Sequence, residues 1–204
     1  RFMFKPGMFE GSISSDIDFQ EDEDRADRNE HPVEEVLFVS DEDDVAFLRI
    51  REGAGKIPLP TPVSLADHVA ADTWIAAIGF PARDPTIRDQ KLVREIFGDV
   101  YEKKRLAPGK VMSVDGALLR HDCSTLGGNS GSVLIDLATG RAVGLHCGGY
   151  LDDSANIAVP AQRLRTLLDE AKRSHAEAPQ RPPPPLPSTP VGSASELETA
   201  RFLV

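Results

Sequence analysis

A serine at position 130 lies in residues 125–132, TLGGNSGS, with glycines on both sides of it. Glycines allow the backbone to turn sharply, so that a serine hydroxyl stands clear of the chain and neighbouring N–H groups converge on one point. Acyl transfer requires both features, whereas a simple turn usually needs only one glycine. The stretch therefore predicts a nucleophilic serine, Ser130, beside backbone donors for a negatively charged oxygen.

Around this stretch, short apolar segments alternate with turn residues, which is typical of a β-sandwich or β-barrel. We predict strands at 33–40, 45–50, 73–80, 110–114, 117–121, 132–135, 142–147 and 156–159. Turns are predicted at Glu52-Gly53, Pro108-Gly109, Asp115-Gly116 and Thr139-Gly140. Residues 92–97 suggest a short helix, and residues 161–177 a long one with leucines on one face. The sequence thus predicts a mostly β fold with a C-terminal helix.

Acidic residues outnumber basic ones by 33 to 23, which gives a formal net charge of −10. This charge disfavours nucleic-acid binding, and no apolar run approaches the ~20 residues of a membrane-spanning helix. Of the 33 acids, 14 fall within residues 16–44, where the calcium-loop spacing D-x-[DN]-x-[DN]-G is not met. We predict a solvated loop at 21–30 and expect neither a metal nor a cofactor.

The C-terminal part is rich in proline, because seven of the 16 prolines fall within residues 179–190. Four consecutive prolines favour an extended polyproline helix, so we expect a stiff linker at 177–193. A ligand for a proline-binding module is the alternative. Residues 194–204 carry a serine cap, a glutamate three residues on and helical apolar spacing, which predicts the start of a further helical module. The folded domain is expected to span residues 1–176.

The first residue is Arg1, and residues 1–10 lack the charged-then-apolar pattern of a signal peptide. We therefore expect this sequence to be part of a longer protein. Any targeting signal would then lie upstream, so no compartment is predicted.

Three segments resemble the trypsin-like (chymotrypsin-fold) serine peptidases, particularly the bacterial ones related to glutamyl endopeptidases. They are residues 122–132 (DCSTLGGNSGS), 143–149 (VGLHCGG) and 44–50 (DVAFLRI). The serine segment is a specific motif, whereas the aspartate segment is weak alone but lies on the correct side of the serine. The resemblance covers roughly residues 10–172. It implies a chymotrypsin-like double antiparallel β-barrel whose first barrel is incomplete in this sequence.

The resemblance implies a role for each matching residue. Ser130 would attack the carbonyl of a peptide bond, and the backbone N–H groups of Gly128 and Ser130 would form the oxyanion hole. Asp44 would orient the catalytic imidazole and stabilise the imidazolium. The alternative is one more surface acid beside Asp41 to Asp43, but only Asp44 adjoins the apolar run. The implied function is a serine endopeptidase that acts on a polypeptide substrate.

The family's catalytic histidine precedes the aspartate by several tens of residues, and this chain departs from that pattern. Only His31 lies upstream of Asp44, too close to it and in a charged segment that we expect to be a surface loop. We therefore expect the histidine and the first strands of the N-terminal barrel to lie outside this sequence. The chain alone would then be a poor enzyme, because Ser130 lacks its proton acceptor. The alternative is a catalytically inactive pseudoprotease that binds peptides or proteins.

The resemblance also implies a specificity. In glutamyl endopeptidases, a threonine five residues before the nucleophile and a histidine in the motif G-[IL]-H-x-G-G line the primary pocket, and Thr125 and His146 stand at these positions. Both can donate hydrogen bonds to a carboxylate, which implies cleavage beside acidic residues. A packed strand histidine is the alternative for His146. Gly148 and Gly149 would let a substrate strand pair with the pocket wall.

Two further features concern activation and redox state. Asn129 stands where trypsin-type zymogens have an aspartate that pairs with a newly freed amino terminus, so this activation switch is expected to be absent. Cys123 and Cys147 would flank the pocket. We expect them to be free thiols rather than a disulfide, because nothing in the sequence indicates an oxidising compartment.

Overall fold

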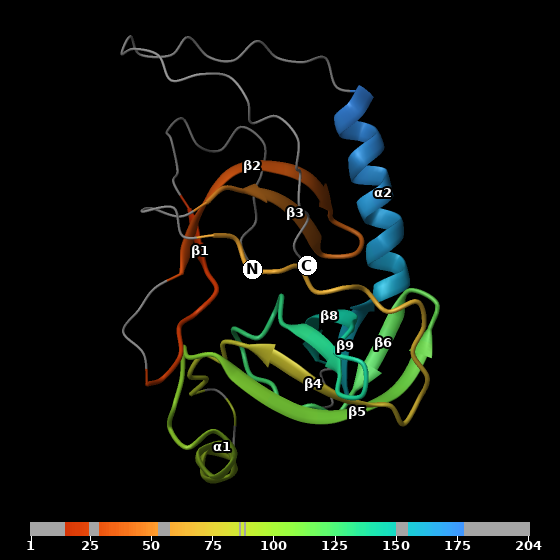
Figure 1. The fold of residues 1–204 in the computed structure, drawn as a ribbon. Helices are drawn as coiled ribbons and strands as arrows, with labels where there is room; N and C mark the ends of the chain where they lie inside the picture. Colours follow the sequence, from red (N-terminus) through yellow and green to blue (C-terminus); the bar gives the residue numbers. More distant parts are fainter. Residues whose placement is uncertain are drawn as a thin grey trace, which may run out of the picture.

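The structure is a computed structural model that describes residues 15–24, 29–52, 58–85, 87, 89–149 and 155–177. Its strands are β1 (Asp16–Asp18), β2 (Glu30–Ser40), β3 (Val45–Ile50), β4 (Trp74–Gly79), β5 (Arg105–Asp115), β6 (Leu118–His121), β7 (Val133–Asp136), β8 (Ala142–Gly149) and β9 (Asn156–Pro160). Its helices are α1 (Gln90–Phe97) and α2 (Ala161–Glu177). Figure 1 shows the sheet of β2 and β3 above the other strands, with α2 running alongside both parts.

Six of these strands close into an antiparallel barrel in the order β4-β5-β6-β9-β8-β7. Successive side chains of a strand point to opposite faces, so every second residue faces the interior. The fully buried interior includes Ile75, Val111, Leu119 and Leu134. This apolar core is the rigid body from which the loops around Ser130 project.

The other sheet comes first in the chain and is called the first sheet below. It has three strands in the order β1-β2-β3. β2 and β3 form a hairpin in which Ser40 pairs with Val45, so that residues 41–44 make the turn. The closed barrel, the partial first sheet and the C-terminal helix confirm the predicted fold class.

Helix α2 packs against both parts of the fold. Leu164 and Leu167 lie on its buried face and form one apolar cluster with Val45 and Phe47 of β3 and Val159 of β9. The helix predicted at 161–177 is confirmed, with its leucine face turned inward as the spacing requires. Through this cluster α2 joins the first sheet to the barrel.

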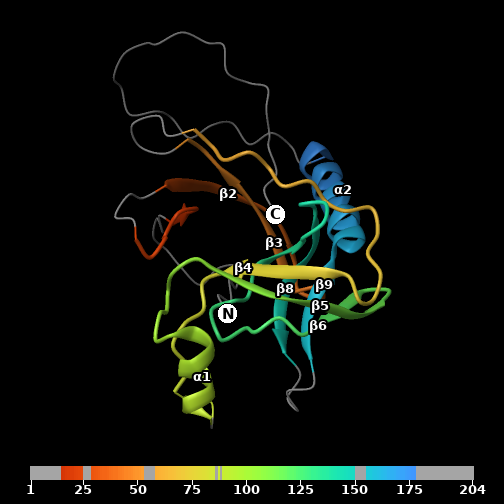
Figure 2. The same cartoon turned by 60° about the horizontal axis from the view of Figure 1, so that its bottom comes forward.

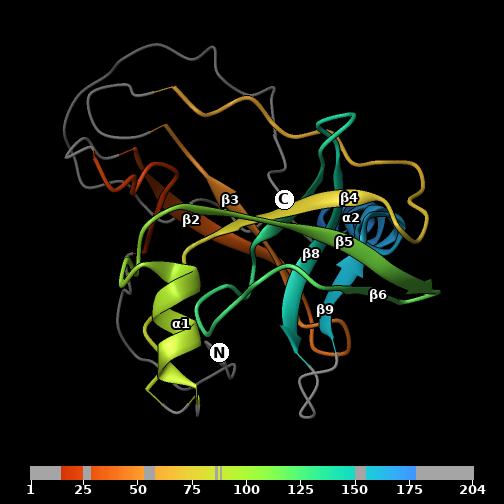
Figure 3. The ribbon, with the colours of Figure 1, turned by 90° about the horizontal axis from the view of Figure 1, so that it is seen from below.

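Helix α1 lies on the opposite side of the barrel from α2, as Figures 2 and 3 show from two directions. Asp89 caps it by accepting a hydrogen bond from the Leu92 N–H at 2.9 Å. Val93 and Phe97 pack on Leu126, which belongs to the glycine-rich serine segment. The predicted short helix is therefore confirmed, and it buttresses that segment from outside the barrel.

The turn predicted at Pro108-Gly109 is wrong, because both residues lie inside β5. Lys110 bonds through its N–H and its carbonyl to Asp122, on the side away from β4. Alternate residues of a strand bond to the same side, so Pro108, two residues earlier, also faces away from β4, and its missing N–H breaks no bond to that strand. Gly109 is explained by a close approach, because a Cβ there would lie 2.7 Å from the backbone nitrogen of Cys123.

The other predicted turns fare better. Gly116 and Gly140 have φ of +52° and +69°, which confirms the turns predicted at these two positions. Gly53, in the remaining predicted turn, lies outside the described residues.

The acidic loop predicted at 21–30 is described only in part. Glu21 and Asp22 form ion pairs with Lys103 and Lys104 at 2.8 and 3.1 Å, which attach this segment to the loop before β5. Residues 25–28 lie outside the described part, and Glu30 already belongs to β2. Of the loop predicted at 21–30, residues 21–24 and 29 are therefore described outside any strand.

The predicted linker at 177–193 lies outside the described residues, apart from Glu177 at the end of α2, and so does the predicted module at 194–204. Neither α1 nor α2 is long and apolar enough to cross a lipid bilayer, and these are the helices of the described residues.

Candidate active site

The serine segment forms a tight loop between β6 and β7. Gly128 and Gly131 have φ of +90° and +89°, a region that other residues rarely adopt. Space is a second constraint at Gly128, because a Cβ there would lie 2.7 Å from the Phe80 carbonyl oxygen. The Gly131 N–H donates to the His146 carbonyl at 2.8 Å, which joins the loop to β8. Ser130, between the two glycines, is exposed.

Asn129 holds this loop from inside, with only 3% of its surface exposed. Its Oδ1 accepts a hydrogen bond from the Leu126 N–H at 3.0 Å, and its Nδ2 donates to the Ser132 Oγ at 3.2 Å. The Ser132 N–H donates back to the Asn129 carbonyl at 2.8 Å. The side chain is uncharged, and its hydrogen-bonding groups are occupied within the loop itself.

Within the described residues, the backbone N–H groups of Gly127, Gly128 and Ser130 in this loop are uncommitted. In the part of the chain that the structure describes, the N–H groups of Gly128 and Ser130 donate to no acceptor, while those of Asn129 and Gly131 are bonded. Uncommitted N–H groups in a tight turn are suited to bind an oxygen that becomes negative during a reaction. Among the described residues, the Ser130 hydroxyl makes one long contact, donating to the Cys147 carbonyl at 3.5 Å, so no strong acceptor there holds it.

Asp44 ends the β2–β3 turn with φ of +55°, in the left-handed region that aspartate tolerates better than most residues. Burial raises the pKa of the Cys147 thiol, and the negative charge of the nearby Asp44 raises it further. The Ser130 hydroxyl contacts the carbonyl of the same cysteine. The fold therefore brings Asp44 from the first sheet and Ser130 from the barrel to one residue of β8.

All five histidines lie within the described residues, and none of them is hydrogen-bonded to Ser130 or Asp44. His68 is exposed, and the Nε2 of His175 lies 2.9 Å from Arg49 Nη2. The other three are buried and have partners elsewhere, as the next paragraphs describe. A candidate general base is thus missing beside the serine within this part of the chain.

The expectation that His31 lies in a surface loop is wrong. His31 is fully buried in β2, with its Nε2 2.7 Å from Asn29 Oδ1 and its Nδ1 3.1 Å from the Arg51 carbonyl oxygen. Phe19 packs edge-on against the ring. β2 begins before the predicted start because β1 pairs with it there, with Ile17 opposite His31. Both ring nitrogens are occupied, so His31 is not free to act as a base.

Thr125 anchors the start of the serine segment to β9. Its Oγ1 donates to Asn156 Oδ1 at 2.8 Å, and Asn156 Nδ2 donates to the Cys123 carbonyl at 2.8 Å. The threonine proton is therefore committed to Asn156 in this state. The Thr125 oxygen retains acceptor capacity only.

His146 is 3% exposed on β8 and pairs with His121, which is fully buried at the end of β6. Nε2 of His121 lies 3.1 Å from Nδ1 of His146, and the rings meet edge-to-face with centroids 5.2 Å apart. Nδ1 of His121 is buried with no hydrogen-bond partner among the described residues. The two histidines thus form a polar contact within the barrel wall, and each ring restricts the orientation of the other.

The pKa of each histidine is lowered to about 4, chiefly by burial, and the neighbouring His146 contributes to the lowering at His121. Charged imidazolium is disfavoured because the interior replaces water around the ring. Near neutral pH both rings are therefore neutral.

Gly148 and Gly149 lie at the end of β8 and pair with Ile157 and Asn156 of β9. The ladder between β8 and β7 ends at Leu145. Within the described residues, the other edge of β8 at these two glycines has no strand partner. An extended peptide therefore has an open edge beside the serine loop.

Cys123 and Cys147 are both free thiols. Cys123 is fully buried and burial raises its pKa to about 11, while Cys147 is half-buried beside Asp44. Within the described residues, no three His, Cys, Asp or Glu side chains gather closely enough to hold a metal ion.

Two residues of this site were missed in the sequence analysis, namely His121 and Asn156. A usable signal existed for His121, because it follows Leu119 by two residues in a predicted strand and so faces the interior with it. Asn156 had no such signal. Its role depends on the pairing of β9 with β6 and β8, which only the closed barrel reveals.

Comparison with known proteins places this geometry in context. A family model described as a trypsin-like peptidase domain matches residues 9–145. A protein of Lysobacter enzymogenes, named a probable serine protease, is 35% identical over 127 residues, which cover 52% of this chain and 33% of that protein. A glutamyl endopeptidase of Staphylococcus epidermidis is 27% identical over 131 residues, covering 62% of this chain and 40% of its own length. The chain thus spans less than half the length of these relatives.

Solved structures of similar fold include a protease from M. tuberculosis in its active form, with a TM-score of 0.50 and 17% identity over 71% of this chain and 60% of that chain. A Glu endopeptidase in complex with MPD gives a TM-score of 0.51 and 18% identity, over 72% of this chain and 65% of its own. At these identities the similarity concerns the fold alone.

Proposed function

The chain belongs to the trypsin-like serine peptidase family, and on this premise we propose that Ser130 attacks peptide bonds and forms an acyl-enzyme. The observation that carries the proposal is the loop at 128–131, where an exposed hydroxyl lies between two left-handed glycines. The uncommitted N–H groups of Gly128 and Ser130 provide the donors that a tetrahedral intermediate requires.

The proposed reaction begins with attack by Ser130 on the substrate and ends with hydrolysis of the resulting ester. The Ser130 oxygen bonds to the substrate carbonyl carbon while its proton passes to an imidazole, and the carbonyl oxygen becomes an anion bound by the two N–H groups. The C–N bond then breaks, and the imidazole returns the proton to the leaving amine. Water repeats the sequence on the ester and releases the acid and free Ser130. The imidazole comes from a histidine of the full-length protein other than the five in this chain, since none of these is bonded to the serine.

Asp44 is the proposed partner of that imidazole. It would accept a hydrogen bond from the ring, fix its tautomer and stabilise its charged form. Support comes from its position beside Cys147, the residue whose carbonyl contacts the Ser130 hydroxyl.

The proposed substrate preference is for acidic residues, and the His121–His146 pair supports it. A buried N–H without an acceptor is rarer than a buried acceptor without a donor. The orphan Nδ1 of His121 therefore favours the tautomer in which His121 donates from Nε2 to Nδ1 of His146. His146 then carries its own proton on Nε2, and a substrate carboxylate would have to compete for it with the Ile157 backbone, to which the ring also hydrogen-bonds.

Thr125 contributes less directly than its position suggests. Its proton is committed to Asn156, so a direct bond to a substrate carboxylate would require that contact to break. We assign it to shaping the pocket wall, with the open edge of β8 at Gly148 and Gly149 receiving the substrate backbone. The 27% identical relative named glutamyl endopeptidase is consistent with this preference.

The test is cleavage of a peptide library by the full-length protein, with product ends identified by mass spectrometry. We expect cleavage after Glu and Asp, and no cleavage by the Ser130→Ala variant. Replacement of His121 by Phe removes the donor that sets the His146 tautomer, so we expect it to weaken the acidic preference about tenfold or more, as loss of a hydrogen bond to a charged group implies.

The His68→Ala variant is the matched control, because His68 is exposed and lies outside this site. It should cleave like the wild type. Cleavage after Lys, Arg or large apolar residues would reject the acidic preference, while leaving the peptidase assignment intact.

The second candidate is a catalytically inactive pseudoprotease that binds peptides, favoured by the lack of a histidine beside Ser130 among the described residues. It predicts that the full-length protein also lacks such a histidine and cleaves nothing, although it retains peptide binding along β8. A cleaving wild-type protein would exclude it.

A further inference from the structure

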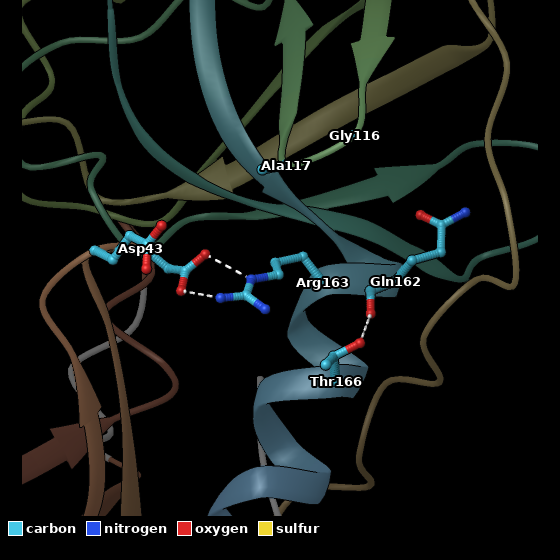
Figure 4. Close-up of a pocket in the computed structure, with 7 residues that line it drawn as sticks. Asp43, Gly116, Ala117, Gln162, Arg163 and Thr166 are labelled. Atoms are coloured by element: carbon cyan, nitrogen blue, oxygen red, sulfur yellow. Dashed lines mark hydrogen bonds and ion pairs between the residues drawn. The ribbon is translucent and has the colours of Figure 1, made fainter.

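A cavity of about 450 Å³ opens where the β2–β3 turn, the β5–β6 turn and the first turn of α2 meet. Figure 4 shows Asp43 on the turn and Arg163 on the helix reaching toward each other at this cavity. Asp43, which lines the cavity, immediately precedes the proposed catalytic Asp44. The function proposed above assigns no role to this pair.

The contact between Asp43 and Arg163 is bidentate. Arg163 Nε donates to Asp43 Oδ1 and Nη2 donates to Oδ2, both at 2.8 Å. The Asp43 side chain is only 7% exposed, and the Arg163 side chain 30%. Two parallel charge-assisted bonds fix direction as well as distance, which a single point contact does not. These bonds lower the pKa of Asp43, so its carboxylate stays ionised and available to the guanidinium.

Ser40 completes the hold on Asp43. Its Oγ donates to Asp43 Oδ2 at 2.6 Å and accepts a bond from the Asp43 N–H at 3.3 Å. The turn is thereby closed on itself and tied to α2 at the same carboxylate. The residue immediately before Asp44 has little freedom to move.

This restraint matters because the Asp44 backbone is in the left-handed region, with φ of +55°. Aspartate tolerates this region better than most residues, but the conformation still carries a cost, which the contacts of the turn help to offset. A relaxed turn would re-aim the Asp44 carboxylate. Triad chemistry is sensitive to such changes, because misplacement by about 1 Å can cost roughly 100-fold in rate.

Arg163, the helix residue of this contact, belongs to an element that is attached to the barrel. Arg163 lies in the first turn of α2, which follows β9 of the barrel directly, and its neighbour Leu164 is buried in the cluster that joins α2 to β3. Asp43 is therefore held from an element continuous with the barrel that carries Ser130.

We propose that Arg163 is a positioning residue, which places the Asp44 carboxylate relative to Ser130 by holding Asp43 with two hydrogen bonds. The proposal rests on the role assigned to Asp44 above. Arg163 touches no reacting atom in this account. It acts through the turn.

The competing explanation is an ion pair that contributes only to stability, and the helix provides a matched control for it. Arg165, two residues along α2, pairs with Asp67 at 3.2 Å and bonds to the Leu65 and Ala66 carbonyls. It links α2 to the loop before β4, away from the β2–β3 turn. Its replacement removes the same charge from the same helix without touching Asp43.

The experiment measures kcat and KM of the full-length protein on a peptide substrate. We expect Arg163→Ala to lower kcat about 10- to 100-fold with KM unchanged. The edge of β8 that is proposed to bind the substrate is unchanged, while the Asp44 carboxylate that orients the imidazole is misaligned. Arg163→Lys should recover part of kcat, since lysine keeps the charge but cannot form two parallel bonds. Arg165→Ala should have the kcat of the wild type.

A double-mutant cycle tests the route through Asp43. If Arg163 acts through Asp43, the variant carrying both Asp43→Ala and Arg163→Ala should have nearly the same kcat as either single variant. Effects that multiply would overturn the proposal, and so would equal kcat values for Arg163→Ala and Arg165→Ala. If Arg163→Ala fails to fold, Arg163→Lys carries the test, and wild-type kcat for it counts against the proposal.

The Asp44→Ala variant separates this inference from the function on which it rests. A strong loss of kcat in Asp44→Ala with none in Arg163→Ala overturns the positioning role alone. Wild-type kcat in Asp44→Ala removes the proposed role of Asp44, and the positioning role with it.

Discussion

A neutral imidazole recognises a carboxylate through one N–H rather than through charge, and this is the state in which burial keeps His146, with its pKa lowered to about 4. A bound carboxylate would stabilise the charged ring and raise that pKa again. Under the proposed substrate preference, binding of an acidic residue and uptake of a proton would therefore be linked at His146. His121 contacts Nδ1 of His146 and thereby fixes the orientation of the His146 ring.

The same residues make a prediction about stability. The pKa of each histidine is about 4 in the folded chain and near 6.5 when unfolded, so between these values the unfolded chain binds more protons. The contribution of the neutral histidines to the free energy of unfolding is therefore complete above about pH 6.5. It is lost as the pH falls toward 4, by up to about 3 kcal/mol for each ring. Urea unfolding of this chain at pH 7, 5.5 and 4.5 should show the loss, and it should be smaller in His121→Phe.

Other groups titrate in the same range, so the comparison needs a histidine outside the pair. His68 is exposed, and the loss of unfolding free energy in His68→Ala should match that of the wild type. An equal loss in the wild type and in His121→Phe would show that the buried pair does not stay neutral.

At the scale of elements, the serine loop is fixed by backbone geometry rather than by charge. Asn129 bonds within the loop, and the left-handed Gly128 passes so close to Phe80 and Ala82 that no side chain fits. Gly127, its neighbour, has no such constraint, because a Cβ there would meet only Asp84 Oδ2 at 4.0 Å. The two glycines therefore make a matched pair.

We expect Gly128→Ala to reduce the rate of peptide cleavage by the full-length protein at least 100-fold, because it displaces a proposed oxyanion donor. Gly127→Ala should cleave at close to the wild-type rate. Both variants are to be compared at equal folded fraction, checked by circular dichroism. Equal rates for the two variants would contradict the account of the loop.

The elements were predictable to the extent that one-dimensional patterns define them. The period-two strands and the leucine face of α2 were found because burial repeats along the sequence. Pro108 was misassigned because its tolerance depends on which side of β5 is unpaired, a property of the sheet. His31 was misplaced for a similar reason, since its strand pairs with β1 and its ring packs on Phe19, both from an earlier part of the chain. The Asp43–Arg163 contact joins residues far apart in sequence, and no local pattern indicates it.

At the scale of the whole molecule, the proposed site is divided between two parts of the fold. Ser130, Gly128 and His146 belong to the barrel, while Asp44 belongs to the first sheet, and α2 packs on both. The relative position of the two parts therefore determines whether the site is assembled. The chain belongs to the trypsin-like peptidase family, and the matched region makes up less than half of the length of these two relatives.

The most direct measurement of the central claim is covalent labelling of the full-length protein with a fluorophosphonate, followed by tandem mass spectrometry of the modified peptide. We predict a single adduct on the Ser130 oxygen, lost in Ser130→Ala and retained in Ser124→Ala, whose exposed serine lies in the same segment. A folded wild-type protein that takes up no label, or takes it up at another residue, would contradict the claim.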